Sequence, residues 1–176
     1  NRILSYAPKT GHVSVWRNDT QGTNGLNFDS KGNLFGCSGN GRKIVRFDPN
    51  GDMSTIVDRL GGRRINSPND LAITPSGSIY FSDRVGDVGP DVGIDHSSII
   101  SAEPQKDGSY ETIRRTFDTT MPNGLLFSKD YKTLYVAQSD YRANEKRELR
   151  AYPVNSDGSL GTYDVLHDFG PHRGID

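Results

Sequence analysis

The chain has few of the features that define several common protein classes. It carries one cysteine, Cys37, among 176 residues, which excludes an internal disulfide and a metal site built from several thiolates. No apolar run approaches the length of a membrane span, and the net charge is only -1, so neither a membrane nor a nucleic acid is an expected partner. The chain starts at Asn1 without a signal peptide, and a leader removed earlier stays possible. We therefore expect a soluble protein whose compartment, cytoplasmic, periplasmic or secreted, stays open.

The motifs of several enzyme classes are also missing. The sequence has no Gly-x-Ser-x-Gly elbow, no phosphate-binding loop and no dinucleotide fingerprint. Its four histidines show no metal-ligand spacing, although His172 lies close in sequence to the terminal Asp176. These absences leave little support for a serine hydrolase or a nucleotide-binding enzyme.

Glycine and proline, in contrast, are plentiful. The chain has 20 glycines and 9 prolines. Such frequent turn residues predict many short elements joined by tight turns. The sequence therefore favours an all-β protein.

A short motif recurs along the chain, with an asparagine or aspartate at or beside the start of an alternating apolar run. Its four copies are Asn24-Gly25-Leu26-Asn27-Phe28, Asn69-Asp70-Leu71-Ala72-Ile73, Asn123-Gly124-Leu125-Leu126-Phe127 and Arg173-Gly174-Ile175-Asp176. The intervals from 24 to 69, 69 to 123 and 123 to 176 are 45, 54 and 53 residues. Repeats of roughly 40 to 50 residues with four strands each are typical of β-propeller blades.

The first complete repeat shows all four expected strands. They cover Gly25 to Phe28, Asn33 to Cys37, Lys43 to Asp48 and Met53 to Val57. The segments 2–8 and 13–16 resemble the two outer strands of a preceding blade. Longer insertions are expected at 83–97 and 139–146, and we interpret 142–150 as a solvated loop. Residues 1–176 are thus predicted to form one partial propeller domain of about four blades, truncated at both ends.

The repeat also predicts a metal site. Equivalent positions on the innermost strands of successive blades face one another around the propeller axis. The repeated residues are Asn24, Asn69, Asn123 and Asp176. Such oxygen donors without sulfur or imidazole favour calcium, magnesium or manganese over zinc or copper. An alternative is that these asparagines only begin strands, where they satisfy their own backbone.

Several of these motifs resemble a known family. Arg64-Ile65-Asn66-Ser67-Pro68-Asn69-Asp70, followed by Ser78-Ile79-Tyr80-Phe81-Ser82-Asp83, is similar to a stretch of bacterial gluconolactonases. Asn123-Gly124-Leu125 resembles the family's second asparagine motif, and Gly174-Ile175-Asp176 looks like the beginning of its Asp-Gly-Met segment. The resemblance, which includes regucalcin, covers essentially the whole chain. It implies a six-bladed propeller with one divalent ion in the channel.

The resemblance also implies roles for individual residues. Asn69, Asn123 and Asp176 match metal ligands of the family, whereas the family's glutamate ligand lies upstream of every residue present here. Asn69, Asn24 and His172 are candidate substrate-binding residues. Calcium is the expected cofactor, with magnesium, manganese or zinc as alternatives. No other cofactor is expected.

The implied activity is hydrolysis of a sugar lactone, a small-molecule substrate. A divalent cation would polarise the lactone carbonyl, and Asp176 would act as the general base towards water or, alternatively, attack directly. Two other functions stay open, namely a phosphotriesterase of the same superfamily and a noncatalytic scaffold with a structural ion. The isolated fragment is expected to be inactive. The sequence specifies neither the natural lactone nor the oligomeric state.

Overall fold

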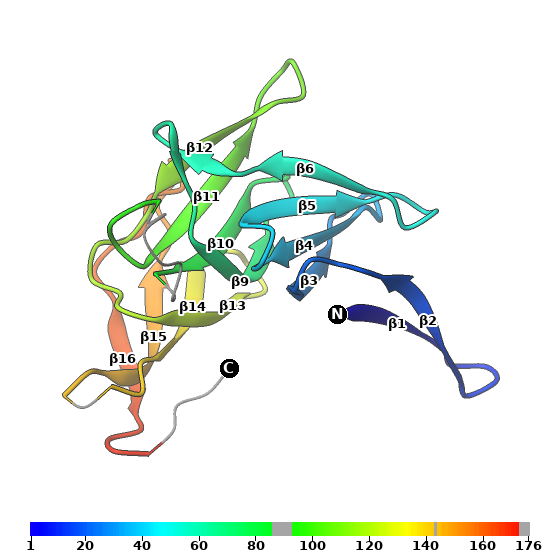
Figure 1. Ribbon diagram of the computed structural model, residues 1–176. Coiled ribbons are helices and arrows are strands. Elements are labelled where there is room, and N and C mark those ends of the chain that lie inside the picture. The colour runs from blue at the N-terminus through cyan, green and yellow to red at the C-terminus, as the bar shows by residue number, and fades with distance from the viewer. Residues whose placement is uncertain (86–92, 143, 173–176) are drawn as a thin grey trace.

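The computed structural model describes residues 1–85, 93–142 and 144–172, and these residues form antiparallel β-structure without a helix (Figure 1). Three four-stranded sheets follow one another along the chain, each with its strands paired in sequence order. The first consists of β3 (Thr23–Phe28), β4 (Leu34–Ser38), β5 (Lys43–Phe47) and β6 (Met53–Val57). The second consists of β9 (Ser67–Ile73), β10 (Ile79–Arg84), β11 (Ser98–Pro104) and β12 (Tyr110–Arg114). The third consists of β13 (Pro122–Phe127), β14 (Thr133–Ser139), β15 (Arg147–Pro153) and β16 (Asp164–Asp168).

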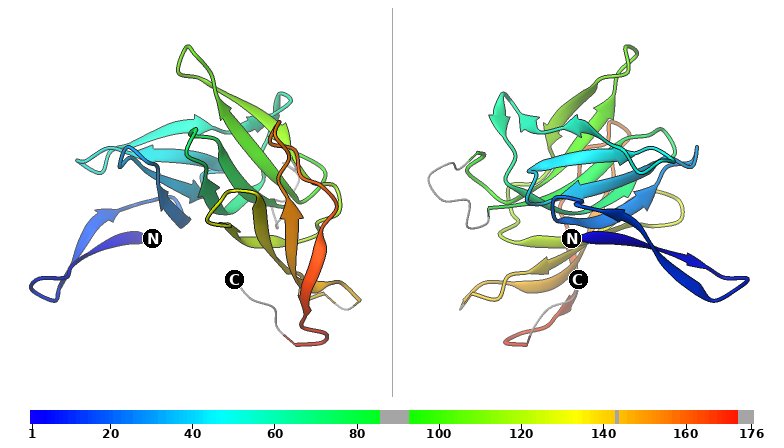
Figure 2. Two further views of the ribbon diagram at one scale, coloured as in Figure 1. Left: turned by 180° about the vertical axis from the view of Figure 1, so that it is seen from behind. Right: turned by 45° about the vertical axis from the view of Figure 1, so that its right-hand side comes forward.

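Two hairpins complete the structure. β1 (Arg2–Ala7) pairs with β2 (His12–Asn18), and the short β7 (Arg59–Leu60) pairs with β8 (Arg63–Arg64). The β1–β2 hairpin lies at one end of the arc of sheets and the β13–β16 sheet at the other (Figure 2). The described residues therefore form a partial β-propeller with three complete blades and one two-stranded blade, which confirms the predicted fold. No helix able to cross a membrane is present in residues 1–85, 93–142 and 144–172.

Turn chemistry explains why the strands end where they do. Asp29 accepts hydrogen bonds from the main-chain N–H groups of Lys31 and Asn33, and Asp48 does the same for Asn50 and Asp52. These side chains satisfy the backbone donors that a tight turn leaves without strand partners. The strands predicted around these turns consequently match the observed ones to within two residues.

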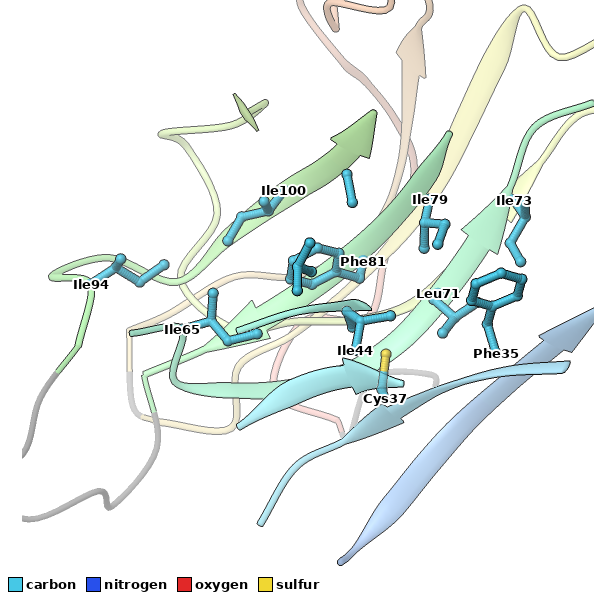
Figure 3. Packing of buried hydrophobic residues seen from close by; sticks show 12 residues of the cluster. Phe35, Cys37, Ile44, Ile65, Leu71, Ile73, Ile79, Phe81, Ile94 and Ile100 are labelled. Atoms are coloured by element: carbon cyan, nitrogen blue, oxygen red, sulfur yellow. The ribbon is translucent and has the colours of Figure 1, made fainter. Parts of the chain in front are cut away.

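The main apolar core lies between the first and second sheets. Phe35, Cys37 and Ile44 of the first sheet pack against Leu71 and Phe81 of the second (Figure 3). Side chains on a strand alternate between its two faces, so each sheet can contact both of its neighbours. Blade-to-blade packing therefore takes the place of a single central core.

Because the side chains of β10 alternate between the two faces of its sheet, this strand contributes to two apolar cores. Ile79 and Phe81 belong to the core shared with the first sheet, whereas Tyr80 belongs to the core shared with the third. Tyr80 and Phe127 meet edge to face, with their ring centroids 5.1 Å apart. Ser82 follows two residues after Tyr80 and faces the third sheet in the same way.

The expected solvated loop at 142–150 is wrong in its second half. Residues Arg147–Pro153 form β15, and the side chains of Glu148 and Arg150 are buried. Arg150 forms a 2.8 Å ion pair with Glu148 and lies 4.2 Å from the ring centroid of Tyr163. A charged residue occupies this strand because its charge is paired within the blade.

Candidate functional site

Each repeated asparagine lies in a β-bulge of the first strand of a blade. In the second blade, Pro68 pairs with Asp83 and Leu71 pairs with Phe81, so Asn69 and Asp70 lie opposite Ser82 alone. In the other two complete blades the bulges are Asn24-Gly25 opposite Cys37 and Asn123-Gly124 opposite Ala137. A bulge bends its strand and redirects a side chain from the regular alternation. The repeated sequence motif thus corresponds to a β-bulge that recurs at the same place in each complete blade described.

Asn69 and Asn123 are brought together by neighbouring blades. β9 contacts both β3 and β13, so the three bulged strands lie side by side (Figure 1). The Oδ1 atoms of Asn69 and Asn123 are both buried and have no hydrogen-bond partner among the described residues. A buried amide oxygen without a partner is energetically unfavourable unless a water, an ion or another ligand contacts it. Both atoms share this property, which makes the pair the centre of the candidate site.

The other predicted site residues have different surroundings. Asn24 occupies the equivalent bulge of the first complete blade, but it is exposed to solvent. His172 is exposed in the turn after β16, where its N–H donates to the carbonyl oxygen of Phe169. Asp176 lies outside the described residues.

The bulges of the second and third blades are joined by hydrogen bonds. Asp70 Oδ2 accepts a 2.8 Å hydrogen bond from the main-chain N–H of Leu125. The Ser82 hydroxyl donates to the carbonyl oxygen of Asn123 at 2.8 Å and accepts from the N–H of Asp70 at 3.1 Å. Neither Asp70 nor Ser82 was predicted as a site residue. Asp70 could have been noticed as the one motif member that replaces glycine in the Asn-Gly pairs.

A second set of contacts holds the segment that leads into β9. The buried carboxylate of Asp83 accepts from the main-chain N–H of Asn66 at 2.9 and 3.0 Å. Burial raises the pKa of Asp83 to about 7, although the main-chain hydrogen bonds from Asn66 and Ser67 and the nearby charge of Arg42 oppose this shift. Gln138 plays the equivalent part in the third blade, where its Oε1 accepts from the N–H groups before β13. The residue opposite the start of each bulge therefore anchors the incoming chain.

A pocket opens beside these anchored segments. Its volume is about 410 Å³, and it is lined by residues that include Arg84, His96, Ser97, Thr120 and Met121. Arg84 pairs with Ser67 at the start of β9, and Met121 directly precedes β13, so the pocket lies at the end of the strands that carries the bulges. A small polar molecule fits such a volume. The expected insertion at 83–97 contributes to this pocket through its described residues, while 86–92 lie outside them.

The donor set fits part of a site for a hard cation. Two partnerless amide oxygens on adjacent strands are the type of ligand that calcium accepts. No group of three or more histidine, cysteine, aspartate or glutamate side chains that could hold a metal occurs within 1–85, 93–142 and 144–172. The two partnerless donors in the described part of the chain are thus neutral amide oxygens.

Comparison with known proteins agrees with this architecture. Residues 1–176 match the family described as the SMP-30/Gluconolactonase/LRE-like region. The chain belongs to this family. A gluconolactonase of Zymomonas mobilis is 30% identical over 160 aligned residues, which cover 84% of this chain and 41% of that protein.

Two solved structures are also similar to this chain. A gluconolactonase of Xanthomonas campestris superposes with a TM-score of 0.80 at 33% identity, covering 94% of this chain and 55% of that one. A calcium-binding regucalcin of Agrobacterium tumefaciens gives a TM-score of 0.62 at 19% identity, with 94% and 51% covered, and shows the shared fold. The chain therefore spans about half the length of these relatives.

Proposed function

We propose that the complete protein containing this chain hydrolyses sugar lactones with the help of a divalent cation. The observation that carries the proposal is the pair of buried, partnerless Oδ1 atoms of Asn69 and Asn123 on matched bulges of adjacent blades. Membership of the gluconolactonase family supports the same reaction class.

In this proposal Asn69, Asn123 and Asp176 hold the ion, which is calcium by preference, since all three offer oxygen donors. A bound divalent cation supplies positive charge that polarises the lactone carbonyl and stabilises the developing oxyanion. Asn69 and Asn123 are neutral, so they hold the ion in place without cancelling its charge. Among the proposed ligands, Asp176 alone is anionic.

Asp176 is also the proposed general base. Its carboxylate accepts a proton from water while the water oxygen forms a bond to the carbonyl carbon. The bond between that carbon and the ring oxygen then breaks, and the ring oxygen takes up a proton to become a hydroxyl group. The product is the open-chain hydroxy acid.

The pocket beside the bulges provides the proposed place for the rest of the substrate. Ser97 and Thr120 line it with hydroxyl groups, and Arg84 adds a cationic group. These groups suit the several hydroxyls of a sugar lactone, because each can donate or accept hydrogen bonds. Asn24 and His172 stay proposed substrate contacts only in the complete protein.

We also propose that further strands and blades of the complete protein cover apolar surfaces that this arc leaves open beside the β1–β2 hairpin and on the third sheet. A groove of about 600 Å³ between the β1–β2 hairpin and the first sheet is lined by apolar residues that include Leu4, Tyr6 and Phe28. At the other end, Leu126 and Leu166 are 66% and 52% exposed. Apolar sheet faces of this kind are normally buried against a neighbour.

The test is a substrate panel on the complete protein. Gluconolactone hydrolysis should be lost on chelation and restored by added calcium, and aryl phosphotriesters should react much more slowly. Faster hydrolysis of the phosphotriesters would replace the lactonase proposal with a phosphotriesterase. Absence of both activities in a folded, calcium-loaded protein would favour a binding scaffold.

A further inference from the structure

The contacts of Asp70 and Ser82 connect the two strands that carry Asn69 and Asn123. Asp70 lies next to Asn69 in the same bulge, and its carboxylate accepts from Leu125 two residues beyond Asn123. The Ser82 hydroxyl binds the carbonyl oxygen of Asn123 itself and the N–H of Asp70. Two hydrogen-bonded bridges thus cross the same blade boundary within a few residues of both asparagines.

The position of Ser82 leaves its hydroxyl group few other hydrogen-bond partners. Its side chain is completely buried, and its alternation with Tyr80 points it towards the third blade. A buried hydroxyl keeps its hydrogen bonds because no water is available to replace them. The geometry at Asn123 is therefore tied to the backbone of Asp70.

The bridges are specific to this boundary. The residues opposite the other two bulges are Cys37 and Ala137, and neither has a hydroxyl. The residues equivalent to Asp70 are Gly25 and Gly124, which have no side chain. Among the three complete blades described, a hydroxyl and a carboxylate thus occur only at the boundary between the strands of Asn69 and Asn123, whose side-chain oxygens are buried without partners.

The packing around Asp70 also differs from that at the other two bulges. A Cβ atom placed on Gly25 would lie 2.4 Å from Asp70 Oδ1 and 2.6 Å from Asp70 Cα. Glycine in the first blade therefore leaves room for the Asp70 side chain, while the second oxygen of its carboxylate reaches Leu125 in the third blade. Asp70, on the inner strand β9, consequently contacts the inner strands β3 and β13 on either side.

We propose that Asp70 and Ser82 are positioning residues that set the separation and orientation of Asn69 and Asn123 across the blade boundary. The inference rests on the proposed function, since the two asparagines are taken as ligands of one ion. Asp70 and Ser82 act through the backbone of the asparagine bulges and do not need to touch the ion or the substrate. Groups that orient ligands in this way commonly change metal affinity 10- to 100-fold when they are removed.

The test uses the complete protein and calcium as the probe. Ser82→Ala should raise the dissociation constant for calcium, measured by calorimetry, on the order of tenfold. Ser82→Thr keeps the hydroxyl and should restore affinity. Asp70→Ala should also weaken binding, whereas Asp70→Asn keeps an acceptor for Leu125 and should retain most of the affinity.

Ser101→Ala is the matched control. Ser101 is as buried as Ser82 and lies in the same sheet, and its hydroxyl accepts a 2.7 Å hydrogen bond from Arg115 Nε, away from the bulges. Both serine variants should lose similar stability in urea unfolding, because each loses a buried hydrogen bond. Only Ser82→Ala should lose calcium affinity.

A second measurement needs no metal. The side-chain amide resonances of Asn69 and Asn123 in ¹⁵N–¹H spectra of the ion-free protein should shift in Ser82→Ala and stay in place in Ser101→Ala. Asn123→Ala serves as the reference variant for the ion site. If it loses calcium binding while a folded Ser82→Ala does not, the positioning role is overturned and the ion site stands.

If Asn123→Ala binds calcium normally, the ion site is overturned, and the amide resonances then decide the positioning role alone. Unmoved resonances in Ser82→Ala would overturn that role. Equal loss of affinity in Asp70→Asn and Asp70→Ala would show that Asp70 acts through its charge, and would overturn its positioning role.

Discussion

Asn69 and Asn123 occupy the same place in the bulges of adjacent blades, and the Oδ1 atoms of both side chains are buried without a hydrogen-bond partner in the described structure. An isolated asparagine at the start of a strand would normally satisfy its oxygen locally. Asn69 and Asn123 instead lie on contacting strands with both oxygens unpaired, and this arrangement is the basis of the proposed ion site.

Asp176 and Asn123 should respond differently to substitution in the complete protein. Asp176→Ala should lower kcat for gluconolactone at least about 100-fold, because it removes both the anionic ligand and the general base. Asn123→Ala should mainly raise the calcium requirement, so that excess calcium restores part of the rate. Steady-state rates across a calcium titration separate these effects. Near-normal turnover by Asp176→Ala at saturating calcium would contradict the assigned role.

The structure also identifies a suitable control for that experiment. Arg142 and Lys146 lie in a loop, but they are unsuitable controls, because Arg142 pairs with the buried Asp140 and Lys146 Nζ lies 3.6 Å from a carboxylate oxygen of buried Glu148. Lys106 is exposed in the turn between β11 and β12. Lys106→Ala should leave both the rate and the calcium requirement unchanged.

Gly25→Ala should destabilise the fold. The added Cβ would meet both the side chain and the backbone of Asp70, and the backbone cannot move away without disturbing β9. A loss of about 1–3 kcal/mol in the free energy of unfolding is expected from such overpacking. Gly161→Ala is the control, since its nearest neighbour would be 3.5 Å away. Urea unfolding of both variants tests the difference, and equal stability would contradict the close packing described for Asp70.

Asp83 should make stability depend on pH. Its pKa is raised from 3.8 to about 7 in the folded chain, so between about pH 4 and pH 7 the folded state retains a proton that the unfolded state has lost. The free energy of unfolding should therefore fall by a few kcal/mol, on the order of 1.4 per pKa unit, as pH rises through this window, and the loss should level off above pH 7. Asp83→Asn cannot titrate and should remove this slope. Urea unfolding at pH 4.5 and 7.5 compares the two proteins, and parallel pH profiles would exclude the raised pKa.

The isolated 176-residue chain should bind calcium weakly and show no lactonase rate above the metal-only background. Among the described residues, Asn69 and Asn123 offer two neutral oxygens, whereas calcium takes roughly six to eight oxygen ligands. The exposed apolar faces at both ends should also promote self-association. Calorimetry and analytical ultracentrifugation measure the two effects. Tight calcium binding with robust turnover would show that this chain contains a complete site.

Much of the fold could be predicted from the sequence because turn residues and alternation are local signals. Met53–Val57 was predicted with its observed bounds, and the insertions at 83–97 and 139–146 end within two residues of β11 and β15. Arg150 was missed because its burial depends on distant groups. It donates to the carbonyl oxygen of Asp118 and stacks on Tyr163, and neither contact is visible in a short window of sequence.

The motif was sufficient to predict that Asn69 and Asn123 lie on inner strands of successive blades, but not how these strands are connected. The use of the two asparagines as ligands stays a prediction. Ser82 has no motif of its own. Its importance depends on which residue lies opposite a bulge and on which face of β10 it occupies, and both facts are set by strand register. Register arises from pairing across the sheet, which a single sequence does not encode locally.

The bulges have a consequence for deletions in this chain. Because Asn69 and Asp70 together face one residue of β10, removal of one of them would leave Pro68 and Leu71 opposite Asp83 and Phe81 as before. The ladder would become regular, and the apolar faces on either side would keep their orientation. The sheet can therefore be built with one residue fewer in each inner strand. If the proposed ion site is correct, the surplus residue is what lets each inner strand present an asparagine, and a shortened chain would keep its blades while losing that side-chain position.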